Sequence, residues 1–189
     1  MNTRDKWNIK HLDRINQLEK PEPNPRLKKL LAYLKEGGKA LDIACGLGGN
    51  SMLLAQTDYQ VEAMDISDVA INYIQTQAAK ENLSIEPRVT DLTTVDTEDW
   101  QNALYNIMVI TYYLDRALFP VVKNSIKEGG YFFMETYYQS PETEGQGISE
   151  QYKLRSNELL EEFRDWKVIY FEENELEGWQ SIFCQKRYN

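Results

Sequence analysis

Apolar and polar positions along the chain follow two spacings in turn, one typical of buried strands and one typical of helices. Short apolar runs that predict strands lie at residues 39–45, 59–66, 85–92, 106–113 and 131–138. Helical spacing follows the first two runs, at residues 50–57 and 67–82. Strands that alternate with helices predict a mostly parallel sheet covered by helices on both faces.

The helix at residues 67–82 has the clearest pattern. Ile71, Ile74 and Ala78 fall on one face, and Ser67 stands where a side chain caps the first turn. A second helix is expected at residues 116–130, broken near Pro120 and ended by the glycines of "KEGG". The acidic segment 93–100 is expected to contain a short helix.

After the fifth strand the pattern changes. Residues 139–151 are rich in Gly, Ser, Pro and acids, which predicts an exposed loop. Residues 156–166 read as a capped amphipathic helix. Residues 166–187 offer two strands around a short turn, so an antiparallel hairpin is expected at the sheet edge.

Size and charge narrow the class of protein. A chain of 189 residues suits a single domain, 1–189. The formal net charge of -9 and the pI of about 4.8 oppose nucleic-acid binding, which depends on clustered Lys and Arg. There is no apolar run long enough to span a bilayer, no signal-peptide pattern and no disulfide framework in two distant cysteines. We therefore expect a cytoplasmic protein without nucleic-acid or membrane partners.

The stretch "ALDIACGLGGNS", residues 40–51, carries the first candidate chemistry. A strand that opens through Gly46, Gly48 and Gly49 into a helix lets backbone N–H groups approach a ligand closely. The dinucleotide fingerprint fails, because its last glycine is replaced by Ser51. One histidine, His11, and two scattered cysteines lack the spacing of a zinc site, so no metal is expected.

Acidic residues end the next two predicted strands. Asp65 in "VEAMDIS" lies at a distance suited to the hydroxyls of a ribose, and Asp91 in "RVTDL" follows the third strand. The carboxyl ends of parallel strands meet at one edge, where doubly wound sheets bind ligands. We expect the glycine loop and both carboxylates at that edge.

With these motifs the chain resembles the class I S-adenosylmethionine-dependent methyltransferases. The matching segments are "LDIACGLGGN", "VEAMDIS", "VTDL", "IMVITYY" and "KEGGYFFMETY", and the terminal hairpin also distinguishes this fold from dehydrogenases. The resemblance covers nearly the whole chain and departs at Ala44, where the family usually has glycine. Within the class, the chain is most similar to the tellurite-resistance and thiopurine type of small-molecule methyltransferase.

The resemblance implies a Rossmann-like α/β fold with a seven-stranded sheet, and S-adenosylmethionine as cofactor. Asp65 would hold the ribose and Asp91 the adenine. The residues implied to bind the cofactor are Asp42, Ala44, Cys45, Gly46, Gly48, Asn50, Asp65, Ile66, Asp91, Leu92 and Thr111.

Methyl transfer from a sulfonium needs mainly alignment. A general base is needed for a neutral hydroxyl or amine acceptor, but not for a thiolate or an oxyanion of selenium or tellurium. The segment "ITYYLDR" lacks the motif of nucleic-acid amine methyltransferases. We therefore expect a small-molecule acceptor with a soft nucleophile, a thiol or a chalcogen oxyanion. No catalytic residue is identified; the candidates are His11, Tyr112 and Arg116.

The acceptor pocket is expected under residues 1–35, an N-terminal helical cover, and the loops after the fourth and fifth strands. Aromatic and cationic candidates from these segments are Trp7, Lys10, His11, Tyr112, Tyr113, Arg116, Tyr137, Tyr138 and Arg155. Simpler interpretations stay open: His11 as a surface residue, Tyr112 and Tyr138 as packing residues, Cys45 as a small loop residue.

Two other functions also fit the sequence. The loop at residues 139–151 offers a docking edge for a protein side-chain methyltransferase. The absence of an evident general base would suit a non-catalytic sensor of S-adenosylmethionine.

Overall fold

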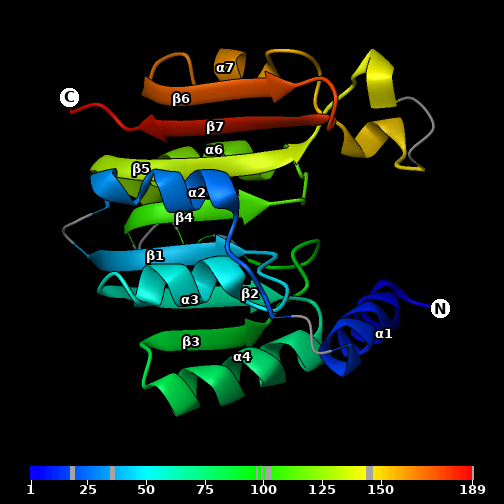
Figure 1. Ribbon diagram of the computed structural model, residues 1–189. Helices are drawn as coiled ribbons and strands as arrows, with labels where there is room; N and C mark the ends of the chain where they lie inside the picture. The colour runs from blue at the N-terminus through cyan, green and yellow to red at the C-terminus, as the bar shows by residue number, and fades with distance from the viewer. Residues whose placement is uncertain are drawn as a thin grey trace. The chain divides into compact units, whose positions relative to one another are not determined.

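A computed structural model of the chain describes residues 1–17, 20–34, 37–96, 98, 100, 104–143 and 147–188. The chain divides into two compact units, Met1–Asp96 and Thr97–Asn189. Seven strands form the mostly parallel sheet with a C-terminal antiparallel hairpin that the sequence predicts (Figure 1). Whether the two units act as the single predicted domain stays a prediction. The predicted short helix at 93–100 lies partly outside the described residues.

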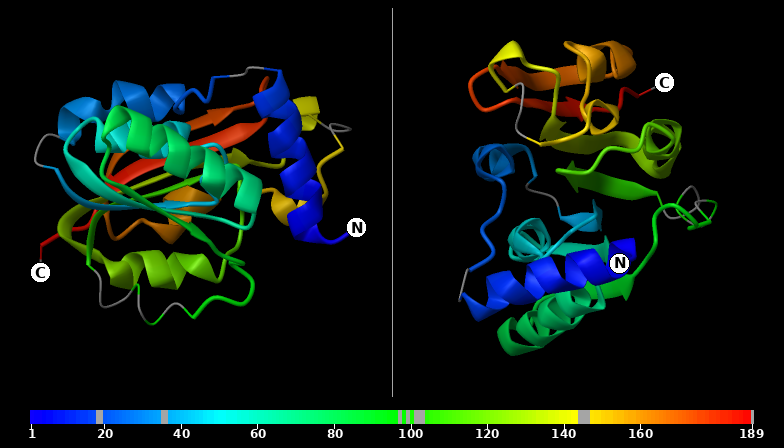
Figure 2. Two further views of the ribbon diagram at one scale, coloured as in Figure 1. Left: turned by 90° about the horizontal axis from the view of Figure 1, so that it is seen from below. Right: turned by 90° about the vertical axis from the view of Figure 1, so that its right-hand side faces the viewer.

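The first unit contains three parallel strands in the order β3-β2-β1. Its elements are α1 (Thr3–Asn16), α2 (Pro25–Lys29), the 3-10 turn η1 (Leu31–Tyr33), β1 (Gly38–Ile43), α3 (Gly49–Ala55), β2 (Tyr59–Asp65), α4 (Asp68–Glu81) and β3 (Ile85–Val89). Helices α3 and α4 cover the same face of these strands (Figures 1 and 2). Because all three strands run in parallel, the loops that follow them share one edge.

Helix α4 forms as its sequence predicts. Ser67 caps it, since its hydroxyl accepts a hydrogen bond from the N–H of Ala70 at 3.1 Å. Ile71, Ile74 and Ala78 are buried on the face that meets the sheet. Asn82, in the left-handed conformation, ends the helix.

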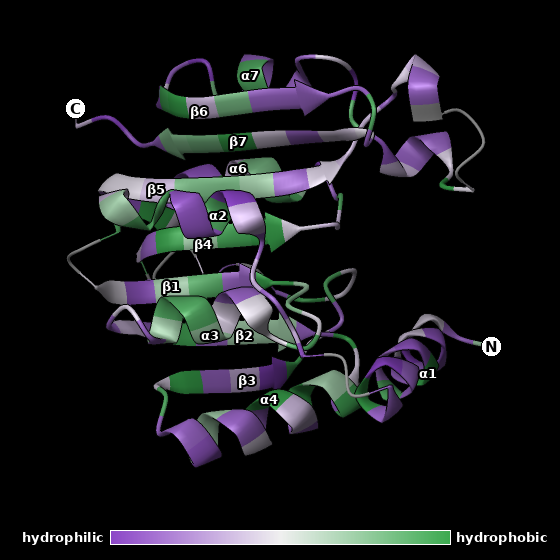
Figure 3. Cartoon of the chain, viewed as in Figure 1, coloured by the Kyte–Doolittle hydropathy of each residue, from purple (hydrophilic) through white to green (hydrophobic). Residues whose placement is uncertain are grey.

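Helix α1 is hydrophilic over most of its surface (Figure 3), and His11 is the one residue of the helix that is fully buried. Helix α1 packs against the first turn of α4 through Asn8. The amide of Asn8 donates to Asp68 at 2.7 Å and accepts from the hydroxyl of Ser67 at 2.6 Å. Polar contacts, more than an apolar face, therefore hold α1 in place.

The second unit contains four strands in the order β4-β5-β7-β6. Its elements are β4 (Tyr105–Thr111), α6 (Leu118–Ser125), β5 (Ile126–Tyr137), the 3-10 turns η2 (Pro141–Thr143) and η3 (Glu150–Tyr152), α7 (Glu158–Glu162), β6 (Lys167–Asn174) and β7 (Trp179–Gln185). Strands β4 and β5 pair in parallel, and the predicted hairpin β6-β7 joins β5 antiparallel.

The predicted helix at residues 116–130 is wrong after Ser125. Pro120 does not break α6, because it lies in the first turn, where a backbone N–H has no helical partner anyway. The helix ends at Ser125, and β5 begins at once. The "KEGG" segment at residues 127–130 is a bulge in β5: Gly129 has a φ of 76°, and the register against β4 shifts there. It does not cap a helix.

The predicted helix at residues 156–166 is much shorter, with only Glu158–Glu162 helical. Its end delivers Phe163 into the core of this unit. The Phe163 ring lies 4.8 Å from that of Phe132, 5.9 Å from that of Phe119 and 5.4 Å from that of Trp166, measured between centroids. The residues that follow Glu162 are therefore positioned by packing between aromatic rings and not by helical hydrogen bonds.

None of the described helices is long and apolar enough to cross a membrane.

We predict that Phe163→Ala lowers the free energy of unfolding by about 3–5 kcal/mol, the usual loss for a buried aromatic ring. Leu160→Ala is the control, because Leu160 belongs to the same helix and is 37% exposed. Its loss should stay below about 1 kcal/mol. Urea unfolding followed by tryptophan fluorescence measures both, and equal losses would contradict the assigned core.

Candidate functional site

The loop between β1 and α3 has an unusual backbone. Ala44, Gly46 and Gly48 all have positive φ, at 54°, 54° and 81°. Glycine adopts this left-handed conformation without strain, whereas alanine costs about 1 kcal/mol. Ala44 therefore occupies the position of the expected first glycine at a modest cost in backbone strain.

The three loop glycines serve different purposes, which the sequence did not distinguish. A Cβ on Gly48 would lie 2.7 Å from Cγ1 of Ile74, and one on Gly49 would lie 2.4 Å from the carbonyl oxygen of Glu22. These two glycines are required by packing within the protein. A Cβ on Gly46 would meet only Cε1 of His11, at 3.4 Å. Gly46 is thus the glycine whose bare face is compatible with a ligand.

Asp65 ends β2, as predicted, and holds the loop. One carboxylate oxygen accepts from the N–H of Gly46 at 2.9 Å, and the other accepts from the N–H of Ser67 at 2.9 Å. Its own carbonyl oxygen accepts from the N–H of Thr90, after β3, at 2.8 Å. A carboxylate has about four acceptor positions, so both oxygens can still accept from a ligand.

Asp42 is fully buried beneath the same loop. One of its oxygens accepts from the hydroxyl of Ser51 at 2.6 Å, while Oδ1 has no hydrogen-bond partner among the described residues. Burial raises the pKa of Asp42 from 3.8 to about 7, the Ser51 hydrogen bond opposes this, and Asp65 adds a smaller increase. A buried acid with an orphaned oxygen suits a donor or a cation brought by a ligand.

His11 lies over Gly46, and the interpretation of His11 as a surface residue is wrong: it is 3% exposed. Its ring stacks on Trp7 at 5.7 Å, and the ammonium of Lys10 lies 4.6 Å from the centre of the Trp7 ring. Burial lowers the pKa of His11, opposed in part by Asp65, so the imidazole is neutral at pH 7. Nδ1 has no hydrogen-bond partner among the described residues.

Other predicted cofactor residues take supporting places in the first unit. Asn50 accepts from the N–H of Asn24 at 2.8 Å and so fixes the start of α2. Burial, together with Asp42 and Asp65, raises the pKa of the Cys45 thiol, which stays protonated. Ile66, Asp91 and Leu92 are half-buried, and the Asp91 carboxylate accepts from the N–H and hydroxyl of Thr93 at 3.0 and 2.6 Å.

Thr111, in the second unit, is the last residue of β4, and Tyr112 follows it with a φ of 57°. Tyr112 is 47% exposed, and its ring contacts those of Tyr137 and Trp179, at 5.8 and 6.3 Å between centroids. Its hydroxyl donates to the buried carboxylate of Glu135 at 3.0 Å. Tyr112 therefore does more than pack.

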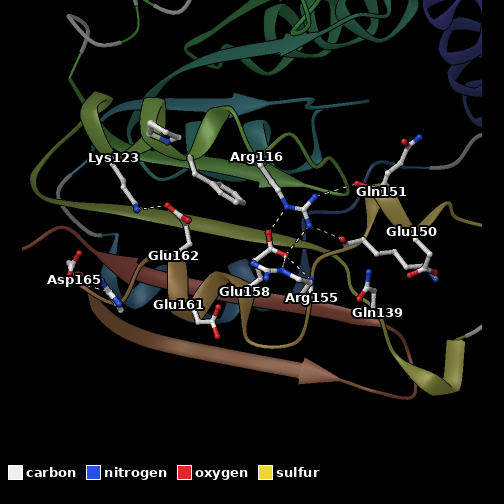
Figure 4. Close-up of a pocket in the computed structure, with 14 residues that line it drawn as sticks. Arg116, Lys123, Gln139, Glu150, Gln151, Arg155, Glu158, Glu161, Glu162 and Asp165 are labelled. Atoms are coloured by element: carbon white, nitrogen blue, oxygen red, sulfur yellow. Dashed lines mark hydrogen bonds and ion pairs between the residues drawn. The ribbon is translucent and has the colours of Figure 1, made fainter.

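Arg116 is held by an ion pair (Figure 4). Its Nε and Nη2 donate to the two oxygens of Glu158 at 2.6 and 2.9 Å, and Nη2 also donates to the carbonyl oxygen of Lys153 at 3.1 Å. Burial raises the pKa of Glu158, but hydrogen bonds from Arg116 and Arg155 outweigh it and leave that pKa lowered. The Arg116 charge is already neutralised within the protein.

Arg116 and Arg155 line a pocket of about 860 Å³ in the second unit (Figure 4). Acids and bases are balanced along its wall, with Lys123 paired to Glu162 at 2.5 Å and Lys153 to Glu150 at 2.7 Å. Tyr138, 3% exposed, instead packs inside the unit. This pocket offers little net charge to an anionic acceptor.

Sequence reasoning missed Glu135. It stands inside the apolar run "YFFMETYY", and it is fully buried in β5. A single carboxylate within a buried strand is a signal that could have found it, because such a group requires partners. Among the described residues, no cluster of acids, histidines and cysteines could hold a metal ion.

Comparison with known proteins places these features in a family. The family model described as "Tellurite resistance protein TehB" matches residues 29–180. A probable S-adenosyl-L-methionine-dependent methyltransferase TehB of Haemophilus influenzae is 26% identical over 140 residues, 72% of this chain and 48% of that protein. Phosphoethanolamine N-methyltransferase 1 of Arabidopsis thaliana is 33% identical over 129 residues, 67% of this chain and 26% of that protein.

The chain thus spans about half the length of the first relative and about a quarter of the second. The crystal structure of TehB from Haemophilus influenzae has the same fold, with a TM-score of 0.72 and 21% identity, over 87% of this chain and 63% of that one. Since the family model covers most of the chain, and the fold agrees, the chain belongs to the TehB family of tellurite resistance proteins.

Proposed function

We propose that this chain transfers a methyl group from S-adenosylmethionine to a small-molecule acceptor with a soft nucleophilic atom. The observation that carries the proposal is the left-handed loop at Ala44–Gly48, with the orphaned oxygen of buried Asp42 beneath it and Asp65 beside it. Relatives named as S-adenosylmethionine-dependent methyltransferases support it. The bound cofactor supplies an activated methyl group on a sulfonium.

The residues of the first unit fit such a cofactor. Asp65 keeps acceptor positions for ribose hydroxyls after it has bound the N–H groups of Gly46 and Ser67. Oδ1 of Asp42 lacks a donor, which the amino group of the cofactor, directly or through water, would supply. Asp91 is proposed to bind near the adenine, and the absence of a side chain on Gly46 leaves room for the cofactor. The chain's own role is to bind and align the reactants.

A soft acceptor, a thiol or a chalcogen oxyanion, is the finer part of the proposal. The family description names tellurite resistance, and tellurite has a soft central atom. Phosphoethanolamine in the name of another relative makes an amine the competing acceptor. Because the Arg116 guanidinium is paired with Glu158, we propose that Arg116 holds this part of the second unit in place and does not bind an anionic acceptor by itself. The acceptor is proposed to lie near Tyr112, and His11 to border the cofactor.

We expect purified protein to consume S-adenosylmethionine with 2-mercaptoethanol or selenite. Chromatography measures the S-adenosylhomocysteine formed over time with each acceptor. Phosphoethanolamine and a carboxylate are the competing acceptors, and a reaction without S-adenosylmethionine is the blank. Turnover with phosphoethanolamine alone would overturn the soft acceptor and keep the methyltransferase. Binding of the donor without turnover of any acceptor would favour a sensor, or a protein side chain as acceptor.

A second prediction concerns Asp65. Asp65→Asn removes its charge and one acceptor oxygen, and a hydrogen bond to a charged group contributes about 1.5–3 kcal/mol. Affinity for S-adenosylhomocysteine should therefore fall about ten- to a hundredfold. Calorimetry measures the Kd, and Glu62→Gln on the same strand is the control for the charge change. A natively folded Asp65→Asn protein that binds as tightly as the wild type would exclude Asp65 from the ribose site.

A third prediction follows from the pKa of Asp42. Because that pKa rises from 3.8 in the unfolded chain to about 7 in the folded protein, the folded state holds an extra proton between these values. The free energy of unfolding should therefore fall as the pH rises from 4 to 7. Asp42→Asn cannot lose a proton, so its stability relative to the wild type should increase across this window.

The expected relative gain is on the order of a few kcal/mol between pH 4 and pH 8. Urea unfolding of the cofactor-free protein at several pH values measures it, again with Glu62→Gln as the control. A constant difference between wild type and Asp42→Asn at every pH would show that Asp42 is already ionised in the folded protein.

A further inference from the structure

Glu135 is the acid in the second unit whose surroundings call for an explanation. It is fully buried, opposite Thr111 of β4 on one side and Ser181 of β7 on the other. Its two carboxylate oxygens accept hydrogen bonds from hydroxyl groups, from Tyr112 at 3.0 Å and from Ser181 at 2.6 Å. These bonds replace part of the water that a carboxylate loses on burial.

Hydroxyl partners differ from arginine or lysine in one respect that matters here. A hydroxyl both donates and accepts, so its contact with a carboxyl group survives when that group takes up a proton. An ammonium or guanidinium group only donates, so its ion pair with a carboxylate is lost when the carboxylate takes up a proton. The Tyr112 and Ser181 contacts are therefore compatible with both protonation states of Glu135.

The backbone of Tyr112 brings its hydroxyl to Glu135. Its φ of 57° is costly for a bulky residue, by about 1–3 kcal/mol, and such conformations cluster at functional sites. The N–H of Tyr112 donates to the carbonyl oxygen of Glu135 at 2.8 Å, so the two residues are joined through backbone and side chain.

The phenol therefore connects the surface to a buried carboxylate. Tyr112 as a residue is 47% exposed, whereas Glu135 is 0% exposed. Tyr137 and Trp179 contact the ring and limit its movement. A small molecule that reaches the Tyr112 hydroxyl is one proton transfer away from Glu135.

We infer that Tyr112 and Glu135 remove the proton of the methyl acceptor, and that the acceptor is accordingly one that carries a proton on its nucleophilic atom, such as a thiol. This rests on the proposed methyl transfer. The acceptor atom forms a bond to the methyl carbon as the bond from that carbon to sulfur breaks, and the electron pair stays on sulfur. The acceptor's proton passes to the Tyr112 oxygen, and the tyrosine's own proton passes to Glu135.

Atoms and charge balance in this step. The methyl group brings one positive charge to the acceptor and one proton leaves it, so a neutral thiol becomes a neutral thioether and the Glu135 carboxylate becomes a neutral acid. Solvent later takes up that proton, as in any methylation of a neutral thiol. Tyr112 touches the acceptor, while Glu135 acts through Tyr112 and is a positioning residue that holds the proton.

Two variants test the inference with little change in shape. Tyr112→Phe removes only the hydroxyl, and Glu135→Gln keeps the side-chain size but is not a proton acceptor. Tyr131→Phe is the matched control, because Tyr131 lies in β5 with Glu135 and its hydroxyl contacts Gln185 instead. Circular dichroism checks folding; if Glu135→Gln unfolds, Tyr112→Phe decides alone.

The probes are 2-mercaptoethanol at pH 7, which carries a proton, and dimethyl selenide, which has none to lose. With 2-mercaptoethanol we expect kcat to fall about 100- to 10,000-fold in Tyr112→Phe and Glu135→Gln, the usual range for general-base loss. KM, the Kd for S-adenosylhomocysteine and turnover of dimethyl selenide should change less than about twofold. Tyr131→Phe should match the wild type.

Other results overturn the inference. Retained kcat with 2-mercaptoethanol would show that no proton passes through the pair, and an equal loss with both probes would show a packing role. Wild-type turnover of dimethyl selenide alone would reject a proton-bearing acceptor while the methyltransferase proposal stands. No wild-type turnover with either probe, with selenite or with phosphoethanolamine would reject the proposed function, and the inference with it.

Discussion

The hydrogen bonds of Asp65 are the constraint on which the candidate site of the first unit depends. This one residue binds the N–H groups of Gly46 and Ser67 through its carboxylate and that of Thr90 through its carbonyl oxygen. It thereby joins the loops that follow three parallel strands. The left-handed glycine loop, the first turn of α4 and the start of the Asp91 loop keep their places because of it.

Both units contain buried acids, and each acid offsets the free-energy cost of burial through different hydrogen-bond partners. Asp65 uses backbone N–H groups, Asp42 uses Ser51 and remains half satisfied, and Glu135 uses the hydroxyls of Tyr112 and Ser181. The oxygen of Asp42 that lacks a partner among the described residues can accept a ligand's donor, whereas Glu158, paired with Arg116, mainly fixes its partners. The distinction separates candidate chemistry from scaffold within this acidic chain.

For several candidate residues, the contacts in the structure differ from those expected from the sequence. A Cβ on Gly48 or Gly49 would clash with Ile74 or with Glu22, so packing within the protein already requires these two glycines. Arg116, expected to meet an anion, is bound to Glu158. His11 is buried above Gly46. Each correction involves a partner at least 20 residues away in the sequence, which spacing arguments do not reach.

The sequence by itself determined the strands, the face and cap of α4, the terminal hairpin, and the positions of the glycine loop and Asp65. These features follow from local periodicity and capping, which act within a few residues. It did not determine that "KEGG" forms a bulge in β5, because glycine suits a helix end and a bulge equally.

Only the tertiary structure decided which polar side chains are buried and what they bind. Asp42 with Ser51, Tyr112 with Glu135, and Arg116 with Glu158 are contacts between separate elements. Their protonation and their availability to a ligand depend on desolvation and on partners brought together by folding. No local pattern of residues specifies those quantities.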